Sequence, residues 1–197
     1  MEVYDISQEV FSCKVFDGDP SPKREEVLKI ENGDLCNLTA FYMCAHNGTH
    51  IDAPYHFINN GSTIEKIPLD KLVGYAYVVE HNGDITSKDA EEILQRAKDA
   101  QKDAEKRILI KGNAIVTYEA SLVFAKANIY LVGNESQTVG PIDAPMMVHK
   151  VLLEKEIVLL EGIRLGNVPE GVYILNSAPI NLQGSDGAPC RAILIKI

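Results

Sequence analysis

The sequence predicts an α/β protein that folds as a single domain, residues 1–197, with a mixed central β-sheet flanked by helices. The length suits one compact domain. Strand-like and helix-like segments alternate through the middle of the chain, which is typical of α/β cores. Both ends carry short strand-like segments between Pro- and Gly-rich turns, and this pattern indicates a mixed sheet or a second sheet.

Short strands and turns are expected in the first part of the chain. Glycine and proline predict a loop at Phe16–Pro22, and His81–Asp84 reads as a turn. The strands expected here are Val3–Ile6, Leu38–Ala45, which would enter the motif region described below, and Tyr75–Glu80.

The clearest helix runs from about Lys88 to Lys106. Thr86 and Asp89 resemble a capping box at its start. Apolar residues recur at helical spacing on one face, namely Ala90, Ile93, Leu94, Ala97 and Ala104. The elements expected after it are the strand Arg107–Lys111, the helix Tyr118–Ala127, the strand Ile129–Val132, the helix Ala144–Lys155 and the strands Ile157–Leu160, Val172–Leu175 and Ala192–Ile195.

Charge and composition exclude several classes of partner. The net charge of −9 argues against nucleic acid and anionic membranes, because both bind clustered Lys and Arg. No apolar run approaches the ~20 residues that span a bilayer, and the N-terminus lacks the pattern of a signal peptide. We therefore expect a cytoplasmic protein in which four scattered cysteines stay as buried thiols, namely Cys13, Cys36, Cys44 and Cys190.

The segment CAHNGTHIDAPYHF, residues 44–57, gathers three of the five histidines beside an aspartate. Imidazole and carboxylate are the ligands expected for zinc or manganese. The spacing of His46 and His50 would suit one helix face, but the glycine between them and Pro54 disfavour a helix. An extended segment after a turn at Asn47-Gly48 fits better, and it would point His50 and Asp52 the same way. Unrelated surface or core histidines are the alternative interpretation.

Two later residues also suit a metal site. Glu161 ends a strongly apolar strand, where a carboxylate is costly unless it is paired or bound to metal. His149 lies within a predicted helix. Taken singly, Glu161 could instead reach solvent at the strand end, and His149 could be an ordinary helix histidine.

The string H-x-G-T-H-x-D-x-P-x-H, at positions 46–56, resembles the signature of the cyclase family of metal-dependent hydrolases, which includes bacterial kynurenine formamidase and isatin hydrolase. Three other segments are similar to the family: VYDISQEV near the start, VHKVLLEKEIVLLEGIRL at 148–165 and GSDGAPCRAILI at 184–195. The resemblance implies a swivelling β/β/α-like fold, a small-molecule substrate and a homo-oligomer, at least a dimer, with the site near a subunit interface.

The resemblance also implies a role for each matching residue. His46, His50 and Asp52 would bind one divalent ion, with zinc expected and manganese the alternative. Asp52 would bridge to a second ion that is also held by His149 and Glu161. His56 would be the catalytic acid/base. One or two ions per chain are therefore expected, and no organic cofactor.

The function that follows is hydrolysis of a C–N bond in a small formamide or cyclic amide by metal-activated water. Two alternatives stay open: a non-catalytic metal- or ligand-binding relative, and a lactone hydrolase, dehydratase or isomerase that uses the same site. The segment GNESQTVG, residues 133–140, lacks the two aspartates that the family often carries in a G-x-D-x-x-S-x-D stretch, and the chain has no tryptophan. The sequence therefore leaves the substrate open.

Overall fold

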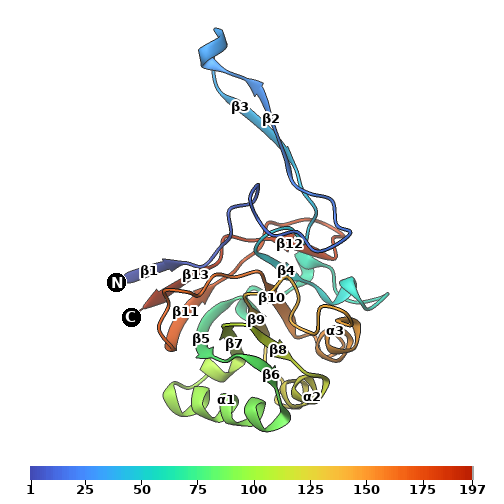
Figure 1. The fold of residues 1–197 in the computed structure, drawn as a ribbon, viewed down its shortest axis with the longest axis vertical. Coiled ribbons are helices and arrows are strands. Elements are labelled where there is room, and N and C mark those ends of the chain that lie inside the picture. Colours follow the sequence, from blue (N-terminus) through green and yellow to red (C-terminus); the bar gives the residue numbers. More distant parts are fainter. Residues whose placement is uncertain (197) are drawn as a thin grey trace.

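A nine-stranded mixed sheet forms the body of the protein in the computed structural model, which describes residues 1–196 (Figure 1). The four central strands are parallel to one another, and the outer pairings are antiparallel. The α/β class and the mixed sheet are confirmed. In sheet order the strands are β1 (Glu2–Asp5), β13 (Ile193–Lys196), β11 (Gly171–Asn176), β5 (Val73–Glu80), β7 (Arg107–Lys111), β9 (Leu131–Asn134), β10 (Val158–Glu161), β4 (His50–Asp52) and β12 (Gly187–Pro189).

Each α-helix within the described residues connects two neighbouring parallel strands. They are α1 (Ser87–Ala100), α2 (Tyr118–Lys126) and α3 (Met146–Leu153). All three crossovers progress the same way along the sheet, and right-handed crossovers of this kind place the helices on one face. The helices therefore cover a single face rather than flanking both. The short strands β6 (Gly83–Ile85) and β8 (Ala114–Val116) pair on the same side.

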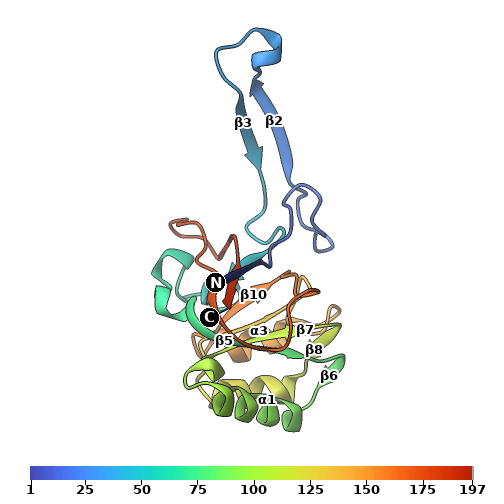
Figure 2. The same ribbon diagram turned by 90° about the vertical axis from the view of Figure 1, so that its left-hand side faces the viewer.

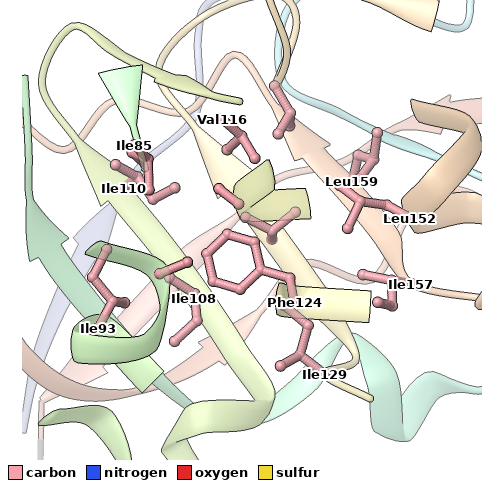
Figure 3. Packing of buried hydrophobic residues seen from close by; sticks show 14 of the residues in the cluster. Ile85, Ile93, Ile108, Ile110, Val116, Phe124, Ile129, Leu152, Ile157 and Leu159 are labelled. Atoms are coloured by element: carbon pink, nitrogen blue, oxygen red, sulfur yellow. The ribbon is translucent and has the colours of Figure 1, made fainter. Parts of the chain in front are cut away.

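Two apolar cores lie on opposite faces of the sheet, because successive strand residues point to opposite sides. Tyr77 and Val79 of β5 belong to the helix-side core, whereas Ala76 and Val78 belong to the other. Figure 3 shows Phe124 of α2 at the centre of the helix-side core, among isoleucines of the strands and of α1. Both faces of the central strands are thus buried, which explains their nearly continuous apolar sequences.

The predicted helix Lys88–Lys106 is too long. The capping box of Thr86 and Asp89 is present, but α1 ends at Ala100. Gln101 adopts an extended conformation and Asp103 has a φ of 70°, so the last predicted residues form a separate 3₁₀ turn at Ala104–Lys106. The other predicted helices and the central strands are confirmed, with ends that differ by one or two residues.

Residues 23–42 form an arm that extends away from the body (Figures 1 and 2). Its strands are β2 (Lys23–Leu28) and β3 (Leu38–Tyr42), which pair only with each other. The strand predicted at Leu38–Ala45 is present but shorter, because it ends at Tyr42. It lies in the arm, outside the main sheet, and does not lead directly into the motif region. β2 itself was not predicted, since its charged sequence lacks the apolar alternation of a half-buried strand.

Two smaller predictions also need correction. The turn expected at His81–Asp84 is shorter, because β6 begins at Gly83. Of the four free thiols expected to be buried, Cys36 is exposed and the other three are partly buried. Among the described residues, no helix combines the length and apolarity needed to cross a bilayer.

Candidate metal centre

The centre is built on β4, which lies between β10 and β12 and is fully buried. His50 and Asp52 share the helix-side face, as the extended reading of the motif predicts, while Ile51 packs into the opposite core. The register places Glu161 opposite His50 and Gly187 opposite Asp52. Three strands from distant parts of the chain therefore meet at the ligand-bearing segment.

A tight turn precedes β4 and folds His46 back toward it, as predicted. The Asn47 side chain accepts a hydrogen bond from the Cys44 amide at 2.9 Å, and the Asn47 amide donates to the Cys44 carbonyl at 3.2 Å. Gly48 has a φ of 70°, in the left-handed region that glycine adopts without strain. His46 Nδ1 then lies 2.8 Å from Asp52 Oδ1.

Residues next to the ligands hold the turn against β10. Thr49 Oγ1 donates to the Gly162 carbonyl at 2.8 Å, and Gln137 Nε2 donates to the Gly48 carbonyl at 3.2 Å. Gln8 Nε2 donates to Gln137 Oε1 at 2.7 Å. Gly162 has a φ of 68°, and a Cβ there would lie within 2.5 Å of three of these groups, so this position requires glycine.

An inner group of donors consists of Asp52, His149 and Glu161. His149 Nε2 lies 3.5 Å from Asp52 Oδ2 and 3.2 Å from Glu161 Oε1. The other ring nitrogen, Nδ1, donates to the Pro145 carbonyl at 2.9 Å, and this contact directs Nε2 toward the carboxylates. All three side chains are at most 3% exposed.

His50 connects the inner group to His46. Its Nε2 lies 3.4 Å from Asp52 Oδ1 and 3.6 Å from Glu161 Oε2. Its Nδ1 donates to the Gly48 carbonyl at 3.1 Å, so Nε2 is the nitrogen left for a metal. Asp52 thus lies between two sets of donors, His46 with His50 on one side and His149 with Glu161 on the other.

An outer group consists of His46, His56 and Asp186. Asp186 Oδ2 lies 2.9 Å from His46 Nε2 and 3.2 Å from His56 Nδ1. The two rings lie 4.1 Å apart, centroid to centroid, at an interplanar angle of 31°. Pro54 starts a 3₁₀ turn, Pro54–His56, that carries His56 off the line of β4, as predicted. Exposure of the side chains rises outward, from 13% for His46 to 27% for His56 and 41% for Asp186.

Electrostatics in the metal-free site favour charged pairs. Burial alone would lower the pKa of each ligand histidine, but the neighbouring carboxylates more than offset it. They raise the pKa to about 11 for His46, about 9 for His50 and about 10 for His149. The histidines in turn hold the pKa values of Asp52 and Glu161 below their usual range despite burial. A metal ion would therefore have to displace protons from these rings.

The donor set fits divalent metal ions. Asp52 Oδ2 is buried and has no hydrogen-bond partner among the described residues, although a buried carboxylate oxygen ordinarily has one. The donor atoms of His46, His50 and Asp52 lie within 4.8 Å of one another, and so do those of Asp52, His149 and Glu161. The first set offers two nitrogens and one carboxylate, and the second offers one nitrogen and two carboxylates. Mixed nitrogen and oxygen donors of this kind are typical of zinc and manganese sites.

A pocket of about 220 Å³ opens onto these side chains. Phe16 and Phe57 give it aromatic walls, and Gln137 and Thr138 add polar ones. It also contacts His46, His50, His56, His149 and Glu161. A larger pocket of about 770 Å³ lies elsewhere, between the base of the arm and the loop around Pro179, and is lined mostly by apolar side chains.

The structure brings together all six residues that the sequence singled out, namely His46, His50, Asp52, His56, His149 and Glu161. It adds Asp186, which sequence reasoning missed although the residue lies in the quoted segment GSDGAPCRAILI. The GNESQTVG segment supplies supporting contacts: the Val139 amide donates to Glu161 Oε1 at 2.8 Å. This segment therefore positions a candidate ligand without its own aspartates.

Comparisons with known proteins agree with this geometry. A family model described as "Putative cyclase" matches residues 4–141. The chain is 33% identical to a kynurenine formamidase of Salinibacter ruber, over 98% of this chain and 97% of that protein. A solved structure described as a "potential metal-dependent hydrolase with cyclase activity" superposes with a TM-score of 0.82 at 30% identity, covering 98% and 96% of the two chains. An isatin hydrolase bound to a product analogue gives a TM-score of 0.83 at 16% identity, over 98% and 91%, which is a likeness of fold.

Proposed function

The chain belongs to the cyclase family, and from that premise we propose that it is a metal-dependent hydrolase that cleaves a C–N bond in a small formamide or cyclic amide. The observation that carries the proposal is the position of Asp52. Its unpartnered Oδ2 faces the inner group, and its Oδ1 faces His46 and His50. One buried carboxylate between two donor sets suits a pair of ions bridged by that residue.

Four of the residues would hold the ions with Asp52: His46 and His50 on one side, His149 and Glu161 on the other. Zinc is the ion we expect, with manganese the alternative. Divalent ions bound there would supply activated water and positive charge for the oxyanion that develops on the substrate carbonyl. The fixed Nδ1 contacts of His50 and His149 keep their Nε2 atoms directed inward, so the donor set is formed before metal arrives.

His56 is the residue we assign to proton transfer. It lines the pocket, is more exposed than the proposed ligands, and is stacked on His46. Its Nδ1 faces Asp186, and no atom of residues 1–196 forms a hydrogen bond with its Nε2, which is therefore free to meet substrate. A histidine in this position can carry a proton to a departing nitrogen.

The pocket limits the part of the substrate that reaches the site. Its volume of about 220 Å³ is below the 300–1,000 Å³ of ordinary ligand pockets, so it accepts a small acyl or formyl group rather than a whole large ligand. Phe16 and Phe57 offer flat apolar walls to an attached ring. The name of the Salinibacter ruber relative, a formamidase, supports the same substrate class.

A panel of substrates tests the proposal. Protein purified without chelator and reloaded with zinc or manganese would be assayed on N-formyl arylamines, small lactams and matched lactones. We expect metal-dependent turnover of at least one formamide or lactam, abolished by chelator and restored by metal. Turnover of lactones alone would contradict the C–N assignment. No turnover by protein that retains its metal would favour a binding protein that has kept the fold.

We further propose that the protein is at least a homodimer in which the arm contacts a second copy. A two-stranded hairpin is marginally stable alone in water, and every residue of β3 is exposed. The arm presents several large apolar side chains to solvent, namely Val27, Ile30, Leu35, Leu38, Phe41 and Tyr42. The apolar pocket of about 770 Å³ at its base offers the complementary surface.

A further inference from the structure

Asp186 is a carboxylate that the metal scheme above does not use. One of its oxygens, Oδ2, lies within hydrogen-bond distance of two imidazoles with different proposed tasks: His46, a metal ligand, and His56, the proton carrier. His46 directs Nδ1 toward Asp52 and Nε2 toward Asp186. A ligand histidine whose second nitrogen meets a carboxylate is a recurring arrangement at metal sites.

The backbone around Asp186 is fixed to the ligand strand itself. The Ala53 amide donates to the Asp186 carbonyl at 2.9 Å, and Gly187 pairs with Asp52 in the sheet. A Cβ at Gly187 would lie 2.8 Å from His46 Cε1, so glycine is what lets this strand approach the imidazole. Main-chain contacts therefore fix the position of Asp186 relative to β4.

We propose that Asp186 is a positioning residue that couples the metal ligand to the proton carrier by accepting hydrogen bonds from both rings. By accepting from His56 Nδ1 it keeps Nε2 as the working nitrogen. By accepting from His46 Nε2 it orients the ring and makes Nδ1 a better ligand. The inference rests on the proposed function, because it takes His46 and His56 in the roles given there.

Two other roles for Asp186 are separable from this one. The donor atoms of His46, His56 and Asp186 also lie within 4.8 Å of one another, so Asp186 could itself bind a metal ion. It could also serve only to hold the fold. Its side chain is 41% exposed, so truncation leaves room for water and should not unfold the protein.

The test uses Asp186→Ala, the conservative Asp186→Asn, which keeps an acceptor oxygen, and Asp84→Ala as a control at an exposed aspartate on β6. Metal stoichiometry and affinity are measured by chelator competition. Imidazole nitrogen shifts in ¹⁵N NMR report the His56 tautomer with and without zinc. Turnover is then measured for each variant alone and combined with His56→Ala.

We expect Asp186→Ala to keep the full number of metal equivalents while losing about 10–100-fold in zinc affinity, the usual effect of removing a carboxylate behind a ligand. Its kcat should fall by a similar factor with KM changed less than about threefold. Protons on His56 should move from Nδ1 toward Nε2, and Asp186→Asn should recover part of each loss. Adding Asp186→Ala to His56→Ala should reduce turnover little further, because both act on one proton transfer.

Three results would overturn the inference. Loss of a whole metal equivalent would make Asp186 a ligand. Metal affinity, tautomer and kcat all within twofold of wild type would leave it without a role in the site. Additive losses in the double variant would show that it does not act through His56. If the wild type hydrolyses nothing on the panel, the proposed function fails, while the affinity and NMR measurements still decide whether Asp186 orients the two rings.

Discussion

The candidate metal centre and the arm are unusual in opposite ways: the centre buries charged side chains, and the arm exposes apolar ones. The centre buries His50 and His149 beside Asp52 and Glu161, and carboxylates are rarely fully buried unless they are paired. The arm exposes large apolar side chains, with Leu35 fully exposed at its tip. In the centre, the buried carboxylates lie next to histidines of the same chain. In the arm, within residues 1–196, the two strands pair only with each other and leave the large apolar side chains more than 40% exposed.

The difference shows what each region requires from outside the chain. The centre is preorganised by strands, a helix and fixed hydrogen bonds. Among its proposed ligands, the buried Asp52 Oδ2 has no hydrogen-bond partner within the described residues, which suits a small cation. The arm consists of two strands that pair only with each other. Its exposed surface carries large apolar side chains, which suits contact with another protein chain. A buried carboxylate oxygen without a partner thus indicates an ion, whereas an exposed apolar surface indicates a protein partner.

The largest expected effect comes from a ligand in the centre. His50→Ala should lose metal and turnover together, because it removes a buried nitrogen that faces both Asp52 and Glu161. His81→Ala is the matched control, since His81 is the one histidine of the five outside the site. Elemental analysis and the active substrate give both readouts. If His50→Ala keeps its full metal content, His50 is not a ligand.

His56→Ala tests the division of roles at the outer edge of the centre. It should keep metal and fold while turnover falls about 10²–10⁴-fold, the usual contribution of a positioned acid/base. The reason is that His56 lies beyond the turn at Pro54 and contacts Asp186 rather than the inner carboxylates. If this variant loses metal as fully as His50→Ala does, His56 is a ligand and the assignment is wrong.

A substitution in the arm should change the assembly of the protein without changing the metal content of the centre. Leu35→Asp places a charge at the arm tip and should shift the protein from dimer to monomer in light scattering at micromolar concentration. The same change at Leu122, an apolar residue of α2 that is 46% exposed, is the control and should leave the mass unchanged. Metal content should be the same in both variants. A monomeric wild type would contradict the proposed assembly, and metal loss in Leu35→Asp would show that the two regions are coupled.

The smallest effect concerns the pH dependence of stability without metal. Stability from the ligand histidines, whose pKa values are raised above the ordinary 6.5, is fully present below pH 6.5 and lost as pH rises through about 9 to 11. Stability from Asp52 and Glu161, whose pKa values are lowered, is present above their ordinary 3.8 and 4.5 and lost as pH falls below them. Chelated protein should therefore be most stable between about pH 4.5 and 6.5.

Thermal unfolding with and without zinc measures this. The Tm of chelated protein should be lower at pH 8.5 than at pH 5.5. Because zinc binds neutral imidazoles, the rise in Tm on adding it should be larger at pH 8.5. A chelated protein that is more stable at pH 8.5 would show that protonated histidines do not hold the metal-free site together.

Much of the body could be predicted from sequence because local patterns and tertiary packing agree there. The apolar runs of β7 and β10 lead to buried strands, and Thr86 with Asp89 caps α1 as its spacing indicates. The arm could not be predicted as a unit. The charged sequence of β2 shows no apolar alternation, and although a strand beginning at Leu38 was expected, nothing in its sequence indicates that it pairs with β2 outside the main sheet. The early end of α1 is made by the extended conformation of Gln101, followed by a left-handed Asp103, and no apolar pattern reveals either.

The candidate site was predictable to the extent that its residues lie close in sequence. His46 to His56 form one motif, and the spacing in the extended segment correctly places His50 beside Asp52. Asp186 was missed because its relation to the motif is made by the pairing of β12 with β4, which is set by tertiary structure rather than local sequence. Asp186 is recognised as part of the site only from the register of β12 against β4, which places Gly187 opposite Asp52.

The position of β4 has a consequence for the order in which the protein can fold. This early strand pairs only with β10 and β12, and His46 and Asp186 are 140 residues apart in the chain. Pairings of such high contact order form late, because the intervening chain must first be closed into a loop. During synthesis the motif at residues 46–56 therefore stays unpaired until β10 and β12 have been made. A nascent chain that ends before β10 carries His46, His50 and His56 but lacks Glu161 and the strand that pairs with β4, so the proposed donor set is incomplete until β10 has been made.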